Sequence, residues 1–305
     1  MMIQFIWDRN VKITAADIPE LTEEIVFGDG FDRQIGPNIL PATIKSIVFG
    51  CGYDRPIGRN VLPSSLESIV FGDDFNQPIA ENVLPENLKY IKFGWDFNQP
   101  IGPNVLPGSL KDISFEWGFN QTIGPNVLPR YLESINFGHC FNQPIGPNVL
   151  PESLESIMFG DHFDQPIDHN VLPEYLKTIR YGHNYNHPIS GLYHLTHLEH
   201  ISIFSKNTIE INVERLPLSL KYFCISNIDT LMSLNSESQR MWFSVTYRDI
   251  QVLLDITYPI FAWPLDSHDN GYEVIGNEFI NGDWYDKLIN PKTYQPRSNA
   301  KSARK

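Results

Sequence analysis

A 22-residue repeat limits the fold of this chain more than any other feature of its sequence. One unit runs from Leu84 to Val105, and we number its positions 1 to 22 from the leucine of the opening Leu-Pro pair. The pair, or an Ile-Pro variant of it, opens units at Ile18, Leu40, Leu62, Leu84, Leu106, Leu128, Leu150, Leu172 and Leu216. The interval from Ile18 to Leu216 is 198 residues, which is nine periods without an insertion. Repeats of this length stack on one another, so the period predicts a solenoid.

The residue pattern inside the unit predicts one short strand and several turns. Positions 1, 5, 8, 10, 14, 18 and 22 are apolar, and positions 8 and 10 alternate with variable positions 7 and 9. This period of two is typical of a strand with one buried face. Proline at positions 2 and 17 and glycine at position 11 leave no room for a helix. Stacked coils would place their strands side by side and parallel, about 4.8 Å apart.

Composition excludes several classes of protein. Of the 23 prolines in 305 residues, 19 occupy repeat positions 2, 17 or 20, so the high Pro and Gly content belongs to ordered turns. The net charge of −13 argues against nucleic-acid binding, which needs a basic face. No apolar run is long enough to span a membrane, and we expect no signal peptide. The three cysteines are widely separated, which favours a reducing, intracellular compartment.

The period divides the chain into four parts. Residues 1–17 are predicted to form an N-terminal half coil or cap, in which Ile3 and Phe5 would occupy the places that Ile25 and Phe27 occupy one period later. Residues 18–237 form the solenoid, whose last two coils are degenerate. Residues 238–296 are interpreted as a cap or a small β module, with Asn281-Gly282 as a hairpin turn. Residues 297–305 form a basic disordered tail, and the stretch from 287 to 305 has six basic and no acidic residues.

Asparagine recurs at two repeat positions. Position 21 is Asn in seven successive coils, and position 15 is Asn or Asp in eight, from Asp32 to Asn186. We interpret these residues as ladders that satisfy turn backbone groups from coil to coil. The alternative is a polar binding stripe, although a binding surface gains more from variation than from identity.

The string Phe97-Asn98-Gln99-Pro100-Ile101, repeated from Phe141 to Ile145, resembles the FNIP repeat, also called IP22. The resemblance implies a right-handed, leucine-rich-repeat-like solenoid that acts as a protein-interaction module, as found in social amoebae and giant amoeba viruses. Many members of the family carry an F-box near the N-terminus, which docks a ubiquitin-ligase core. Only 17 residues precede the first full coil here, so we expect no F-box.

The variable positions 7, 9 and 12 predict a continuous binding surface. Position 9 is valine in the first coils, and aromatic and charged residues follow in the middle coils. Aromatic and Arg side chains are enriched at interaction hot spots. The candidate partner-binding residues are Tyr90, Lys92, Trp95, Trp117, Asn136, His139, Met158, Arg180 and His183. In the alternative interpretation, Trp95 and Trp117 fold sideways and pack on the edge of the stack.

The sequence contains no recognisable catalytic, cofactor or metal motif. Eight of the nine histidines lie between His139 and His200, and we interpret them as surface and turn residues. Cys140 with His139 and His162 is a weak thiol–base candidate, because adjacent residues on an extended chain point apart. We therefore expect a non-enzymatic chain that needs no cofactor and no metal.

We interpret the chain as a monomeric repeat scaffold that binds an unidentified protein, with no nucleic-acid or membrane partner. If the chain is viral, the partner would be a host protein and the location the host cytoplasm. One alternative is a ubiquitin-ligase substrate receptor that lacks its own F-box. Another is a structural or duplicated passenger protein with no specific ligand.

Overall fold

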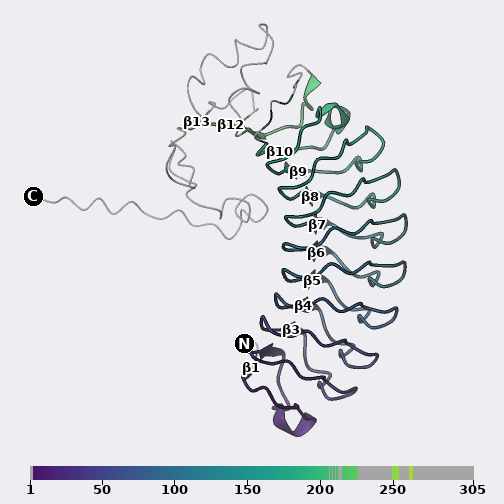
Figure 1. Cartoon of the computed structure of the whole chain (residues 1–305). Coiled ribbons are helices and arrows are strands. Elements are labelled where there is room, and N and C mark those ends of the chain that lie inside the picture. The colour runs from purple at the N-terminus through teal and green to yellow at the C-terminus, as the bar shows by residue number, and fades with distance from the viewer. Residues whose placement is uncertain are drawn as a thin grey trace, which may run out of the picture.

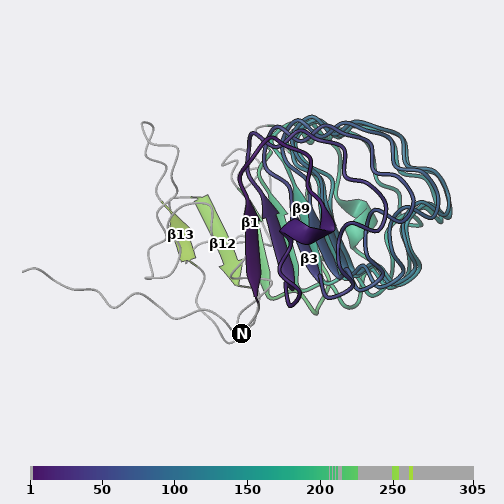
Figure 2. The same cartoon turned by 90° about the horizontal axis from the view of Figure 1, so that it is seen from below.

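The chain folds into an arc of stacked coils that share one continuous sheet. The structure is a computed structural model, which describes residues 3–205, 207, 209, 211, 215–225, 249–253 and 261–263. The strands follow the inner, concave side of the arc, and the turns fan out on the outer side (Figure 1). Viewed along the stack, successive coils superimpose, with the strands together on one side (Figure 2). This confirms the predicted solenoid.

The sheet runs in chain order through thirteen strands. Strands β1 to β11 are Gln4–Trp7, Glu24–Phe27, Ser46–Val48, Ser68–Val70, Tyr90–Lys92, Asp112–Ser114, Ser134–Asn136, Ser156–Met158, Thr178–Tyr181, His200–Ile203 and Tyr222–Ile225. They pair in parallel, and from β2 onward each residue faces the one 22 positions later. Two short 3₁₀ helices, η1 (Ala15–Asp17) and η2 (Ser190–Leu192), lie between strands. The degenerate coils thus keep the register.

The core contains two parallel files of stacked aromatic rings, from repeat positions 10 and 14. Phe93 and Phe97 lie 3.9 Å apart in one coil, and Phe97 lies 6.1 Å from Phe75 in the preceding coil. All seven predicted apolar positions of the coil that opens at Leu84 are at most 8% exposed. Each coil therefore buries its apolar side chains largely against its neighbours, as expected of units too small to fold alone.

The predicted phase of the N-terminal strand was wrong by two residues. Phe5, not Ile3, pairs with Ile25, and Trp7 pairs with Phe27. Trp7 is 5% exposed in the core, whereas Ile3 is 44% exposed. A shift of two keeps the same side chains inward, because the strand period is two. The larger indole ring thus takes the place of a core phenylalanine, and the first coil is two residues shorter than the rest.

The position-15 residues form the predicted ladder. The Asn98 side-chain oxygen accepts hydrogen bonds from the Asn120 backbone N–H at 2.9 Å and from Gln121 Nε2 at 3.0 Å, and the same pattern repeats along the stack. Position 21 serves a different purpose. Six of its asparagines, from Asn38 to Asn148, have φ between 59° and 62°, a left-handed conformation that Asn tolerates better than most residues.

Two further strands continue the sheet in antiparallel orientation. β12 (Asp249–Leu253) pairs with β11, and β13 (Phe261–Trp263) pairs with β12. Antiparallel strands of this kind can cover the last edge of a parallel stack. The boundary at 237/238, the Asn281-Gly282 turn and the tail at 297–305 lie outside the described residues, so the four-part division of the chain stays a prediction.

Candidate interaction surface

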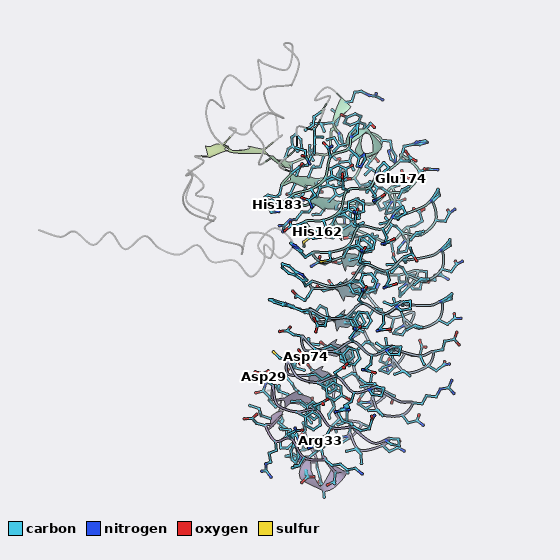
Figure 3. The ribbon with its side chains drawn as sticks, viewed as in Figure 1. Asp29, Arg33, Asp74, His162, Glu174 and His183 are labelled. Carbon is cyan, nitrogen blue, oxygen red and sulfur yellow. The ribbon has the colours of Figure 1, made fainter. Side chains whose placement is uncertain are left out.

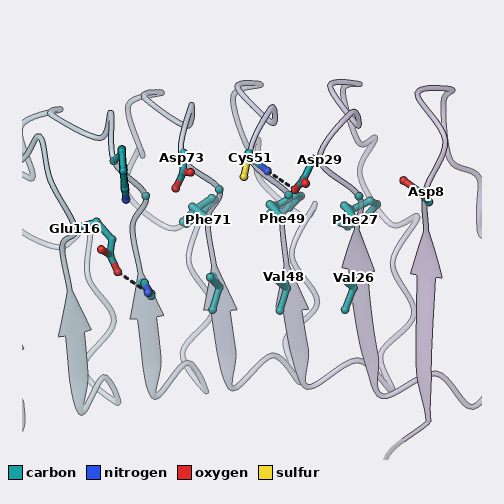
Figure 4. Close-up of a pocket in the computed structure, with 17 residues that line it drawn as sticks. Asp8, Val26, Phe27, Asp29, Val48, Phe49, Cys51, Phe71, Asp73 and Glu116 are labelled. Carbon is teal, nitrogen blue, oxygen red and sulfur yellow. Dashed lines mark hydrogen bonds and ion pairs between the residues drawn. The ribbon is translucent and has the colours of Figure 1, made fainter. Parts of the chain in front are cut away.

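The concave face is built by the last part of each strand and the turn after it. Position 9 points out of the sheet, position 10 points into the core, and position 11 is glycine in most coils. A Cβ added at Gly72 would overlap the carbonyl oxygen of Gly50, so close backbone approach between coils requires glycine here. Position 12 follows directly, at the rim where the strands end (Figure 4). Each coil thus presents floor residues at positions 7 and 9 and one rim residue at position 12.

Five consecutive rim residues touch one another, and we call them the rim column: Trp95, Trp117, His139, Asp161 and His183. The ring centroids of Trp95 and Trp117 lie 5.7 Å apart, and His139 stacks on Trp117 at 3.8 Å. One oxygen of Asp161 then lies 3.1 Å from His139 Nδ1, and the other is hydrogen-bonded to His183 Nδ1 at 2.6 Å. The column is therefore held by contacts at every step.

The two tryptophans of the rim column remain open to solvent. Trp95 is 53% and Trp117 48% exposed, although each ring packs against its column neighbour. At the other end of the column, the hydrogen bond from His183 holds the pKa of Asp161 below its ordinary value. Figure 3 shows His162 and His183 on the concave side of the arc and Glu174, at position 3, on the opposite side. The column thus pairs an aromatic end with a charged end.

The other predicted surface residues line the floor beside the rim column. Lys92 forms an ion pair with Glu116, and Asn136 Oδ1 accepts from the backbone N–H of Gly138 at 3.0 Å. Arg180 Nη1 donates to the sulfur of Met158 at 3.7 Å, and its guanidinium also lies 4.6 Å from the Phe204 ring centroid. Tyr90 and the other floor residues are half-buried. The structure therefore brings all nine candidates onto one face.

A hollow of about 590 Å³ lies on the same face toward the N-terminus (Figure 4). Its floor is aliphatic, formed by Val26, Val48 and Val70. Along its rim stand Asp8, Asp29 and Asp73, with Cys51 between the two latter residues. Burial raises the pKa of the Cys51 thiol, and hydrogen bonding to Asp29 raises it further. The hollow thus combines an apolar base with an acidic edge.

The family model of the FNIP Repeat matches residues 10–52, 53–96, 75–117, 97–140, 119–162 and 141–182, which together cover more than half of the chain. The chain belongs to the FNIP repeat family. The matched copies span the coils that carry most of the rim column and all of the hollow except Asp8. Comparison with the curated proteins gave no match.

Solved structures extend the comparison. The FNIP-repeat chain is similar to CroV588, a circular leucine-rich-repeat protein of a giant virus, with 40% identity and a TM-score of 0.69 over 73% of this chain and 33% of that one. It also matches a chain of the Toll–Spatzle complex of Drosophila, with 15% identity and a TM-score of 0.53 over 68% of this chain and 31% of that one. The second likeness shows the fold alone. This chain spans about a third of the length of both.

Sequence reasoning missed three features of this FNIP surface. The first is the ion pair of Glu116 with Lys92. Glu116 occupies position 11, which is glycine in the coils on either side, at Gly94 and Gly138, and this exception in the sequence could have pointed to the contact. Asp161 was visible only as one variable residue at position 12. Ile6 pairs with Val26, so the row of outward aliphatic residues at position 9 continues onto β1. The predicted phase of the N-terminal strand was wrong, and Ile6 was therefore not assigned to this row. Each of these contacts depends on which residues of successive coils become neighbours.

The described residues give no support to a metal site or a reactive thiol. Among them no group of three or more His, Cys, Asp or Glu side chains could hold a metal ion. Burial raises the pKa of the Cys140 thiol, which opposes its activation as a nucleophile. No helix in the described part of the chain is long and apolar enough to cross a membrane.

Proposed function

We propose that this FNIP-repeat chain is a non-enzymatic scaffold that binds another protein through the rim column and the adjoining strand floor. The observation that carries the proposal is the exposure of Trp95 and Trp117, which are half open to solvent at consecutive rim positions. Large exposed apolar side chains that lie together on a soluble protein mark interaction sites more often than isolated ones do.

The rim column is well suited to a protein partner for a second reason. Its rings are already stacked, so binding would immobilise few side chains and would lose little conformational entropy. The aromatic end offers apolar area, and the Asp161 carboxylate with its two histidines offers hydrogen bonding to polar groups of the partner. Tryptophan at such a place carries a large share of binding energy at many interfaces.

Affinity capture with paired variants tests the proposal. The full chain is used as bait in an amoeba lysate, beside Trp95→Ala/Trp117→Ala and the control Tyr131→Ala/Tyr175→Ala. The control residues are 49% and 55% exposed and lie at position 4, outside the rim column, so the control loses exposed aromatic area elsewhere. We expect a protein that the wild type and the control retain and the tryptophan variant loses by at least tenfold, with unchanged circular dichroism.

Other outcomes favour other functions. Recovery of ubiquitin-ligase core subunits would support a substrate receptor that lacks its own F-box. Equal capture by all three baits would place the binding surface elsewhere on the chain. Repeated absence of any specific partner would support a structural or passenger protein. In a viral setting the captured partner would be a host protein, which the same experiment would identify.

A further inference from the structure

The N-terminal hollow carries an excess of negative charge that the described residues do not neutralise. Its lining contains four carboxylates, Asp8, Asp29, Asp73 and Glu116, and one ammonium, Lys92, which gives a net charge of −3. Lys92 pairs with Glu116, whereas no ion pair joins the other three carboxylates to a cation of the described part of the chain. Three carboxylates that stand along one edge repel one another and attract a cationic segment.

The floor of the hollow is apolar, so a molecule that binds there also needs apolar groups. Val26, Val48 and Val70 stand half-buried on neighbouring strands, and Ile6 continues the row on β1 with 61% of its surface exposed. Four strands at about 4.8 Å spacing make an aliphatic row of about 14 Å. An occupant that matched both features would carry aliphatic or aromatic side chains together with Lys or Arg.

We propose that the hollow binds the chain's own C-terminal segment, residues 287–305. This segment contains six basic and no acidic residues, while the rest of the chain has a net charge of −19. It also carries Leu288, Ile289 and Tyr294, which supply the apolar side chains that the valine row requires. The segment thus matches the hollow in charge and in apolar content. This inference rests on observations other than those behind the function proposed for the rim column, although Lys92 and Trp95 also line the hollow.

The chain is long enough for this contact. From β13, which ends at Trp263, to β4 the sheet measures nine strand spacings, about 43 Å. The 24 residues from Trp263 to Lys287 span up to about 80 Å when extended. Tethering also raises the effective concentration of the segment at the hollow, to the millimolar range for short flexible linkers. A contact that would be weak between separate molecules can therefore be occupied within one chain.

Carbodiimide cross-linking of the full chain, read by mass spectrometry, tests the proposal. The reagent joins lysines to carboxylates in contact, so we expect links from Lys287, Lys292, Lys301 or Lys305 to Asp8, Asp29 or Asp73. These should exceed by at least fivefold the links to the position-3 carboxylates Glu86, Glu152 and Glu174, which lie on the opposite side of the coils from the concave rim, as Figure 3 shows for Glu174.

Two matched variants make the test specific. Val48→Arg keeps every carboxylate but places a cation on the floor, and it should reduce the hollow links at least fivefold. Ser64→Arg adds the same charge at an exposed position-3 site and should leave the links unchanged. Equal links to hollow and position-3 carboxylates, or hollow links that persist in Val48→Arg, would overturn the proposal. Links between isotopically labelled and unlabelled copies would also overturn it, since the occupant would then be a second chain.

A second measurement leaves the solenoid sequence untouched. In Lys301→Glu/Arg304→Glu/Lys305→Glu, the exposed Cys51 thiol of the hollow should react with iodoacetamide at least threefold faster than in the wild type. Cys140, which lies four coils farther along, serves as an internal reference whose rate should not change. An unchanged Cys51 rate would contradict occupation of the hollow by this segment, whatever Val48→Arg does to folding.

Discussion

At the scale of the residue, the double file of aromatic rings is the most demanding feature of the core. Phe97 is 1% exposed and stacks on rings of its own coil and of both neighbouring coils. Truncation leaves a cavity that a continuous file cannot close, so Phe97→Ala should cost about 3–5 kcal/mol of unfolding free energy. Urea unfolding followed by circular dichroism measures this loss. The exposed Trp95→Ala serves as control, and an equal loss in both variants would refute the core role of position 14.

A partly buried histidine should make stability depend on pH. Burial lowers the pKa of His200 from 6.5 to about 4, so between these values the unfolded chain binds a proton that the folded chain does not. Stability from this group is therefore complete above pH 6.5 and is lost as pH falls toward 4. We expect His200→Gln to flatten the fall of the melting temperature over this range. Parallel melting curves of the two proteins from pH 7 to pH 4 would contradict the burial argument.

At the scale of the element, glycine decides how closely neighbouring coils approach. Gly72→Ala would drive a Cβ into the backbone of Gly50, and backbone cannot move aside as a flexible side chain can. We expect a loss of about 1–3 kcal/mol, typical of overpacking. Gly30 has nothing within 4 Å of an added Cβ, so Gly30→Ala should be neutral or slightly stabilising. Thermal melts of both variants test the pair, and equal stability would mean that position 11 tolerates a side chain.

The strands were predictable because one pattern is copied many times. Each strand from β1 to β11 is only three or four residues long, too short to identify from its own composition, but the alternation of positions 7 to 10 recurs from coil to coil. The N-terminal strand was predicted with the wrong phase, since its two-residue offset preserves the inward–outward alternation that revealed it. The repeated pattern therefore predicted where the strands lie. It could not predict the register of β1, which departs from the 22-residue period.

The contacts within the candidate surface were less predictable than the surface itself. All nine predicted residues lie on the concave face, because positions 7, 9 and 12 always emerge there. The sharing of Asp161 between His139 and His183, and the ion pair of Glu116 with Lys92, depend on which side chains of neighbouring coils meet in the stack. The same holds at position 6, where Glu and Lys form ion pairs between neighbouring coils: Glu23–Lys45, Glu67–Lys89, Lys111–Glu133, Glu155–Lys177 and Glu199–Lys221.

At the scale of the whole molecule, the 22-residue step should make whole coils removable. Deletion of residues 84–105 joins Val83 to Leu106 and keeps every later residue in register, so we expect a folded, shorter stack with somewhat reduced stability. Deletion of residues 84–104 removes one residue less and turns the following strand over, which exposes its apolar face. Circular dichroism and small-angle scattering distinguish the two products, and similar folding of both would contradict a register set by the period.

The regular pairing of each coil with the next also has a mechanical consequence. From β3 to β10 each strand pairs with strands 22 residues away on either side, and within the described residues no coil pairs with a distant one. Tension applied between the two ends of the stack would therefore act on the terminal coil first and release the coils in succession. Each release would lengthen the chain by about 70–80 Å of extended backbone. Under force the protein would therefore extend in many steps of similar length, one coil at a time.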